Sequence, residues 1–430
     1  MKTFLKKIPG VRLISHVRWL FWYVYIPVVL AHFRYKRTLK RLRGAAAVRK
    51  LKVGFVIGSS SKWKAQSLYE KMLRSSEFEP IVVLTICDSA SRYSAEKCVK
   101  QLDETRSFFK GRGMHCVEAY SRETGICVDL AKMGFDIVIY HQPWGVVDEQ
   151  MPYNVAKRSL TFYIPYYVAD YGDCRFDCDP PFNRTVYGYL TTNDAWAKVY
   201  EDYMRHKIHE CRYLALGHTG LDYAAAVDMS RTDGRYIIYA PHWAFSCDAM
   251  ANAENYSTFL WTGKLILEYA KRHPEQSWVF KPHPTLKQYL HETKVWDDCE
   301  IESYYAEWGK IATTCFDGDY HRYFWDSKAM VTDCGSFLME YPCTGRPLIH
   351  LISPDCKVTP ISASADYFQT FYRVVCVEDM ERVFRMILED GKDPMRENRI
   401  RKLREMKLIG NDASKNIIEY LQNLVHGRYC

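Results

Sequence analysis

A chain of 430 residues exceeds the usual size of one hydrophobic core, so two domains are expected. Hydrophobic residues make up 48% and charged residues 26%, a globular composition that excludes a disordered or low-complexity chain. The formal net charge is +8, but residues 1–50 hold 13 Lys or Arg and no Asp or Glu, so the rest of the chain carries 8 minus 13, or −5. A mildly acidic body argues against a broad nucleic-acid-binding surface.

The 15 cysteines are scattered singly, and Cys174 and Cys178 form the one close pair apart from incidental neighbours. No second pair completes a zinc-type pattern, so no metal site is predicted. The scatter favours a reducing compartment in which most thiols are buried and no disulfide is required.

The N-terminal segment 1–50 is basic and aromatic. Residues 17–33 are apolar and rich in Trp and Tyr, but Pro27 interrupts them and the apolar run is shorter than the ~20 residues that span a bilayer. Cations flank the run and are densest in 34–43. We predict an interfacial helix on an anionic membrane surface, whose removal should leave a folded protein. A signal peptide fits less well, and a helix that packs on the protein's own core is the remaining alternative.

Residues 51–225 should form a first α/β domain, because apolar runs typical of strands alternate with helical segments. The expected strands lie at 52–58, 80–86, 115–117, 136–140 and 161–167, with helices after the first strand and at 94–110. The glycines of the first strand have neither Walker nor dinucleotide-binding spacing.

Two side chains of this first half are candidates for a general base. His141 follows the strand at 136–140, and Asp170 belongs to an acidic loop at 168–184. Acidic loops can bind metal, but most are simply solvated, and we favour the second interpretation. Residues 222–234 are interpreted as a linker.

Residues 226–395 repeat the alternation and should form a second α/β domain, followed by a helical tail at 396–430. Its expected strands lie at 236–243, 278–284, 328–332, 348–351 and 371–377. Three of them end in polar tips, which contain His242, then Lys281 and His283, then Thr332 to Ser336. Because parallel strands bring their carboxyl ends to one edge, these tips should form an anion site suited to a diphosphate.

The stretch 328–351 carries most of this prediction. A buried strand breaks at Thr332-Asp333-Cys334-Gly335-Ser336, a short helix follows, and Gly345-Arg346-Pro347 stops it before the next strand. Hydroxyls, backbone N–H groups and a helix N-terminus suit a phosphate. An ordinary strand-to-helix turn capped by Asp333 explains the turn alone equally well. Three polar tips in succession favour the functional interpretation.

These residues also carry a family resemblance. The segments Tyr239-Ala240-Pro241-His242, Phe280-Lys281-Pro282-His283-Pro284, Thr332 to Phe337 and Glu340-Tyr341 resemble the CDP-glycerol glycerophosphotransferase family, which includes teichoic-acid polymerases and capsule enzymes. Earlier segments at 61–64, 163–166 and 217–222 are similar to relatives of that family. The resemblance spans roughly 50–380 and is specific in the second half.

The resemblance implies a GT-B fold: two Rossmann-like domains facing a cleft, with a CDP-alcohol donor on the second domain and the acceptor on the first. His283 would contact the donor pyrophosphate and His242 would line the same cleft. Donor-phosphate binding would fall to Lys281, His283, Thr332, Asp333, Gly335, Ser336 and Glu340, with no cofactor or metal.

Two departures from the family pattern bear on substrate identity. Teichoic-acid polymerases carry a Trp-His-Gly motif in the first domain, and the comparable stretch here is Ile164-Pro165-Tyr166-Tyr167. Their double-serine turn is Cys334-Gly335-Ser336 here. Donor and acceptor can therefore differ from glycerol phosphate and its polymer.

The sequence thus predicts a transferase at the inner face of a bacterial cell membrane, which moves an alcohol-phosphate group from a CDP-activated donor to a hydroxyl of a surface polysaccharide or lipid-linked acceptor. One alternative keeps the fold and uses a nucleotide sugar, as a glycosyltransferase does. Another is a non-catalytic, membrane-associated assembly factor.

Overall fold

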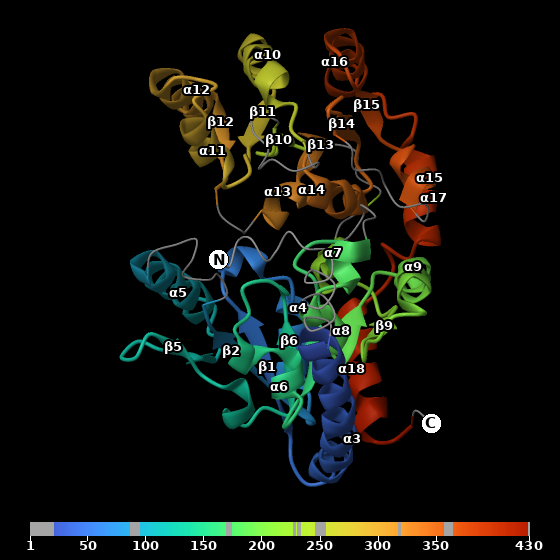
Figure 1. The fold of residues 1–430 in the computed structure, drawn as a ribbon. Coiled ribbons are helices and arrows are strands. Elements are labelled where there is room, and N and C mark those ends of the chain that lie inside the picture. The colour runs from blue at the N-terminus through green and yellow to red at the C-terminus, as the bar shows by residue number, and fades with distance from the viewer. Residues whose placement is uncertain are drawn as a thin grey trace, which may run out of the picture. The chain divides into compact units, whose positions relative to one another are not determined.

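The computed structural model describes residues 21–86, 95–168, 174–226, 229, 234–245, 255–316, 320–356 and 364–428. The chain divides into two compact units (Figure 1). Unit 1 comprises Met1–Tyr166, Asp173–Asp222 and Asp412–Cys430, and unit 2 comprises Tyr167–Gly172 and Tyr223–Asn411.

Unit 1 is built on a seven-stranded sheet of order β3-β2-β1-β6-β7-β8-β9. Its strands are β1 (Leu51–Ile57), β2 (Phe78–Leu84), β3 (Cys116–Glu118), β6 (Ile137–Tyr140), β7 (Leu160–Tyr163), β8 (Gly188–Leu190) and β9 (Arg212–Leu214), with a small hairpin of β4 (Tyr120–Ser121) and β5 (Ile126–Cys127) beside it. Every pairing within the large sheet is parallel. This confirms the α/β class that the alternating pattern predicted for the first half.

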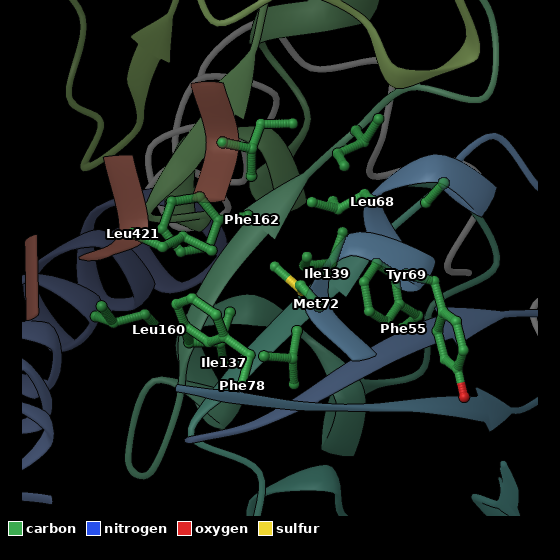
Figure 2. Packing of buried hydrophobic residues seen from close by; sticks show 14 of the residues in the cluster. Phe55, Leu68, Tyr69, Met72, Phe78, Ile137, Ile139, Leu160, Phe162 and Leu421 are labelled. Atoms are coloured by element: carbon green, nitrogen blue, oxygen red, sulfur yellow. The ribbon is translucent and has the colours of Figure 1, made fainter. Parts of the chain in front are cut away.

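The helices of unit 1 cover this sheet and close its core. They are α3 (Ile26–Ala46), α4 (Gln66–Arg74), α5 (Ala95–Lys110), α6 (Pro152–Val155), α7 (Cys174–Cys178), α8 (Pro181–Thr185), α9 (Asp194–Met204) and α18 (Ala413–Val425). Figure 2 shows Phe55, Ile139 and Phe162 from three strands in one cluster with Met72 from α4 and Leu421 from α18. Burying such side chains is the main favourable term for this unit.

The N-terminal helix α3 packs on unit 1. Tyr35 is 1% exposed, and its hydroxyl bonds Thr161 and donates to the carbonyl of Thr185 at 2.8 Å. Arg41 and Arg49 donate to the carboxylate of Asp136 at 3.1 and 2.6 Å. The expectation that segment 1–50 could be removed without loss of the fold is therefore corrected, because removal would uncover the core and leave a buried carboxylate without its cations.

None of the helices in the described ranges combines the length and apolarity that crossing a bilayer requires. A π-helical turn, η1 (Phe21–Tyr25), leads into α3, and its Phe21, Trp22, Tyr23 and Tyr25 side chains are exposed.

Unit 2 is built on a six-stranded parallel sheet of order β12-β11-β10-β13-β14-β15. Its strands are β10 (Tyr236–Ala240), β11 (Ser277–Phe280), β12 (Ala312–Thr314), β13 (Ser327–Thr332), β14 (Leu348–Leu351) and β15 (Tyr372–Val374). Its helices are α10 (Phe259–Arg272), α11 (Leu286–Thr293), α12 (Asp298–Ile311), α13 (His321–Trp325), α14 (Gly335–Glu340), α15 (Ala365–Phe368), α16 (Val377–Phe384) with the π turn η9 (Arg385–Glu389), and α17 (Arg396–Glu405).

The last helix returns to the first unit. The predicted tail 396–430 instead separates into α17, which packs in unit 2, and α18, whose Ile417, Leu421 and Leu424 join the core of unit 1 beside α3 (Figure 1). Asp222 fixes this return by accepting hydrogen bonds from the N–H groups of Ala413 and Ser414 at 2.9 and 3.1 Å.

Candidate functional site

The three polar tips of unit 2 lie at one edge of its sheet. β10 is paired with β11 on one side and with β13 on the other, and Ala240 is in register with Thr332. The segments that follow these strands carry His242, His283 and the turn at Cys334–Ser336. Strand order alone therefore gathers them at the carboxyl edge, where open α/β sheets bind ligands.

His283 is held in one tautomer by the backbone. The N–H of Thr285 donates to its Nδ1 at 3.2 Å, and its own N–H donates to the carbonyl of Pro241 at 2.9 Å. Since Nδ1 accepts, a neutral ring carries its proton on Nε2. That Nε2–H has no acceptor within the described part of the chain, and the residue is half-buried. His283 thus presents a fixed hydrogen-bond donor.

His242 repeats the arrangement on the neighbouring strand. The N–H of Ala244 donates to Nδ1 of His242 at 3.1 Å, which again leaves the proton on Nε2. The rings of His242 and His283 have centroids 5.1 Å apart, and Trp243 and Tyr256 pack around them. Two fixed donors of this kind suit the oxygens of a phosphate group.

Both rings are neutral over the physiological range. Burial lowers the pKa of His283 to about 4, and the charge of Lys281 acts in the same direction. Burial also lowers the pKa of His242 well below its usual value, with a further contribution from His283. With Nδ1 occupied and Nε2 protonated, neither ring has a lone pair free to accept a proton. The geometry favours hydrogen-bond donation over general-base catalysis for both.

The third tip separates into positioning residues and accessible ones. The Thr332 hydroxyl donates to the carbonyl of Ala240 at 2.6 Å and accepts from the N–H of Cys334 at 3.0 Å. Gly335 and Ser336 begin α14, are partly exposed, and have no side-chain cap before them. The first N–H groups of a helix have no acceptor inside the helix, so those at this turn remain able to bind an anion. Of the two predicted hydroxyl ligands, the accessible one is Ser336.

Asp333 joins three elements of the site. Its carboxylate accepts the N–H of His242 at 2.6 Å, and the N–H and hydroxyl of Thr258 at 2.7 and 2.9 Å. Burial raises the pKa of this carboxyl to about 6, although these hydrogen bonds favour its charged form. The geometry gives Asp333 the role of positioning the His242 segment rather than that of contacting a phosphate.

Lys281 and Glu340 lie in a buried polar and aromatic cluster. Lys281 Nζ stands over the ring of Tyr320 at 4.8 Å and that of Phe337 at 5.6 Å. The Tyr320 hydroxyl donates to Glu340 Oε2 at 2.6 Å, and Glu340 is 1% exposed. Glu340 therefore braces α14 from inside, while Lys281 adds positive charge behind His283.

The two predicted general bases, His141 and Asp170, have different outcomes. His141 is fully buried, its Nδ1 lies 3.2 Å from the carbonyl of Ile164, and burial lowers its pKa to about 3. A buried, weakly basic ring is not placed to take a proton from an acceptor, so we do not retain it as a base. Asp170 lies outside the described residues and stays a prediction. Within those residues, no group of three His, Cys, Asp or Glu could hold a metal ion.

A cationic and aromatic cluster lies instead at the carboxyl edge of the unit 1 sheet. Lys62 Nζ donates to Gln142 Oε1 at 2.6 Å and lies 5.9 and 5.7 Å from the ring centroids of Trp144 and Tyr166. A small pocket beside it is lined by Gly58, Ser59, Lys62, Thr85, Ile86, Cys98, Gln101 and Gln142. Cys98 and Gln101 belong to α5, and the other lining residues follow β1, β2 and β6. The strand order changes direction between β1 and β6, and this is the preferred ligand position in such sheets.

Sequence reasoning missed several of these contributors. Lys62 and Trp144 lie 82 residues apart in the chain, and no spacing in the sequence shows that they meet. Thr258 lies 75 residues from Asp333 in the chain, and nothing in the sequence links them. The position of Trp243, directly after His242 at a strand end, was an available signal.

Comparison with known proteins shows similarity to solved structures alone: no protein-family model and no curated protein matches the chain. The UDP-GlcNAc 2-epimerase from Neisseria meningitidis, solved with UDP-GlcNAc bound, is 13% identical with a TM-score of 0.52, over 87% of this chain and 100% of that one. The wall teichoic acid polymerase TagF is 12% identical with a TM-score of 0.50, over 93% and 98%. The UDP-GlcNAc 2-epimerase from Methanocaldococcus jannaschii is 12% identical with a TM-score of 0.50, over 86% and 99%.

At such identities the similarity concerns the fold. It covers both units and agrees with their two parallel sheets. The protein therefore has a GT-B-type fold built from two Rossmann-like α/β units, as the sequence predicted.

Proposed function

We propose that this protein is a transferase that moves an alcohol-phosphate group from a CDP-activated donor to a hydroxyl of a surface polysaccharide or lipid-linked acceptor. The observation that carries the proposal is the pair of Nε2–H donors on His242 and His283, next to the open turn at Gly335 and Ser336. The similarity of the surrounding segments to CDP-glycerol glycerophosphotransferases supports the choice of donor.

In the proposed reaction the acceptor oxygen forms a bond to the phosphorus that carries the alcohol, and the bond from that phosphorus to the bridging oxygen of CMP breaks. The bonding pair leaves with CMP, whose phosphate gains negative charge. His242 and His283 would stabilise that charge by hydrogen bonds that need no rearrangement, and Lys281 would add its positive field. The acceptor proton passes to solvent or to a protein base, for which Asp170 remains the proposed residue.

Unit 1 would hold the acceptor. Trp144 is 41% exposed and offers a flat apolar surface to a sugar or polyol, while Lys62 beside it would pair with a phosphodiester. We place the enzyme at the inner face of a bacterial cell membrane, where a lipid-linked acceptor and a cytosolic nucleotide donor can meet.

A nucleotide-sugar donor is the second candidate, because a structural neighbour binds UDP-GlcNAc and the same two donors could stabilise a UDP leaving group. A non-catalytic assembly factor is the third. Measuring which donor the protein binds and turns over would distinguish all three candidates.

The test is a thermal-shift screen of CDP-, UDP-, GDP- and CMP-linked compounds on the full chain. A ligand at 100 times its Kd should stabilise the folded protein by ~2.7 kcal/mol. We expect a CDP-alcohol to give the largest shift, and hydrolysis or transfer of that compound to be lost in His283→Ala. A shift with UDP-sugars alone would favour the glycosyltransferase. No shift and no turnover with any donor would favour the assembly factor.

A further inference from the structure

The helix α3 has two chemically different faces. Its inward face, Ala31, Tyr35, Thr38 and Leu42, is buried against unit 1. Its outward face, which we define as Leu30, Phe33, Lys36, Arg37 and Lys40, is exposed together with the aromatic turn η1. A helix that only packed on its own core would not need apolar side chains on the outside.

The cations of α3 are sorted between these faces. Arg34, Arg41 and Arg43 donate to the carbonyl of Tyr153, to Asp136 and to the carbonyl of Leu424, so unit 1 already pairs them. Lys36, Arg37 and Lys40 point outward, and within the described ranges they form no side-chain hydrogen bond or ion pair. The helix carries no acidic residue that could neutralise them.

The aromatic side chains are concentrated at one end. Trp22 is 56% exposed, Tyr23 60% and Phe33 60%, and they precede the outward cations along the axis. Trp and Tyr prefer the headgroup level of a bilayer, and Lys and Arg pair with anionic lipid phosphates. An acidic protein partner would account for the cations but not for this exposed aromatic cluster.

We propose that η1 and the outward face of α3 form a surface that binds an anionic lipid bilayer, with unit 1 docked behind it. The helix does not act as a detachable anchor, because its other face is part of the core. Its aromatic end enters the headgroup region more deeply than its cationic end. This surface would serve the proposed transferase, but its test needs no nucleotide and no turnover.

The experiment measures binding of the full chain to vesicles of phosphatidylcholine, with and without phosphatidylglycerol, at low and high salt. We expect binding to the anionic vesicles that weakens as salt rises. Each cation at such a surface contributes about fivefold in affinity, so Lys36→Glu with Lys40→Glu should lower it at least ~30-fold. Trp22→Ser with Phe33→Ser should weaken binding at both salt concentrations, since apolar insertion is not screened.

Two matched controls isolate the surface. Lys100→Glu with Lys110→Glu makes the same charge change on the exposed side of α5 in the same unit, and Phe316→Ser removes an exposed aromatic from unit 2. Both should bind like the parent, and all variants should melt like it. Equal binding to neutral vesicles, equal loss in the α5 control, or capture by a polyglutamate resin in place of vesicles would each overturn the proposal.

Discussion

At the carboxyl edges of both sheets, a backbone N–H donates to the Nδ1 of a histidine, but the histidines have different roles in the two units. In unit 1 the N–H of Gly220 donates to Nδ1 of His218 at 3.1 Å, as Ala244 and Thr285 do for the two histidines of unit 2. The Nε2 of His218, however, lies 2.7 Å from the carbonyl of Pro165 and is satisfied by it. The same backbone hydrogen bond to Nδ1 therefore fixes a loop in unit 1 and orients two Nε2–H donors in unit 2. Whether Nε2 already has a partner within the protein decides whether the histidine is structural or can bind a ligand.

The largest expected effect comes from His283. Removing one preorganised donor typically costs about 10²–10³ in rate, so His283→Ala should lose that much turnover while donor binding changes less. His283→Gln can place an amide N–H near the former Nε2 and should recover a substantial part. Steady-state kinetics with each variant measures both effects.

Melting temperatures of the same variants provide the control. Both should melt close to the parent, because His283 does not support the core. A folded His283→Ala protein with parental turnover would contradict the donor role, and equal losses in the Ala and Gln variants would favour proton transfer instead.

His218 should show the opposite behaviour. His218→Ala leaves the buried carbonyl of Pro165 unpaired, which should cost about 1–3 kcal/mol of unfolding free energy. A Cβ at Gly220 would come within 2.9 Å of His218 Cε1, so Gly220→Ala should disturb the same loop. Chemical denaturation measures the loss, and a His218→Ala protein of parental stability would break the comparison.

Asp333 is expected to fall between these cases. In Asp333→Asn an amide N–H would oppose N–H donors from His242 or Thr258, which should cost about 1–3 kcal/mol of stability and also lower turnover by moving His242. The N–H of Thr285 still holds the ring of His283, so binding of the nucleotide-linked substrate should survive in part. A variant with reduced stability but unchanged turnover would limit Asp333 to a purely structural role.

Ser336→Ala should have a mild effect, less than the loss in His283→Ala, because backbone N–H groups of the turn remain. Kinetics with donor titration checks this. A loss as large as that of His283→Ala would move the centre of the site from the histidines to the turn.

The smallest expected effect is on the pH profile. The pKa of His283 is lowered to about 4 and that of His242 is lowered well below its usual value, so neither ring should give the turnover profile an inflection near pH 6.5. For stability, the depressed pKa of His283 means that the unfolded chain binds more protons between about pH 4 and 6.5, so this contribution rises with pH across that window. An inflection near 6.5 that disappears in His283→Gln would contradict the neutral donor.

Much of the architecture was readable from the sequence. The apolar residues within 52–58 and 328–332 predict buried strands, and parallel strands gather their carboxyl ends at one edge by geometry alone. The grouping of His242, His283 and the turn at Ser336 follows from that rule. Among the three-residue strands, β3 and β15 overlap predicted segments, whereas β8 and β12 carry too little apolar pattern and are not predicted.

Tertiary contacts decided the roles of single side chains. The sequence cannot show that Pro165, 53 residues away, satisfies His218, or that Thr258 occupies Asp333. The outward charge of α3 is visible in the sequence, but the burial of Tyr35 depends on Thr161, 126 residues further along. Local pattern determines where a polar group lies along the chain, whereas hydrogen bonds between distant segments determine whether it is already satisfied or remains available for a ligand.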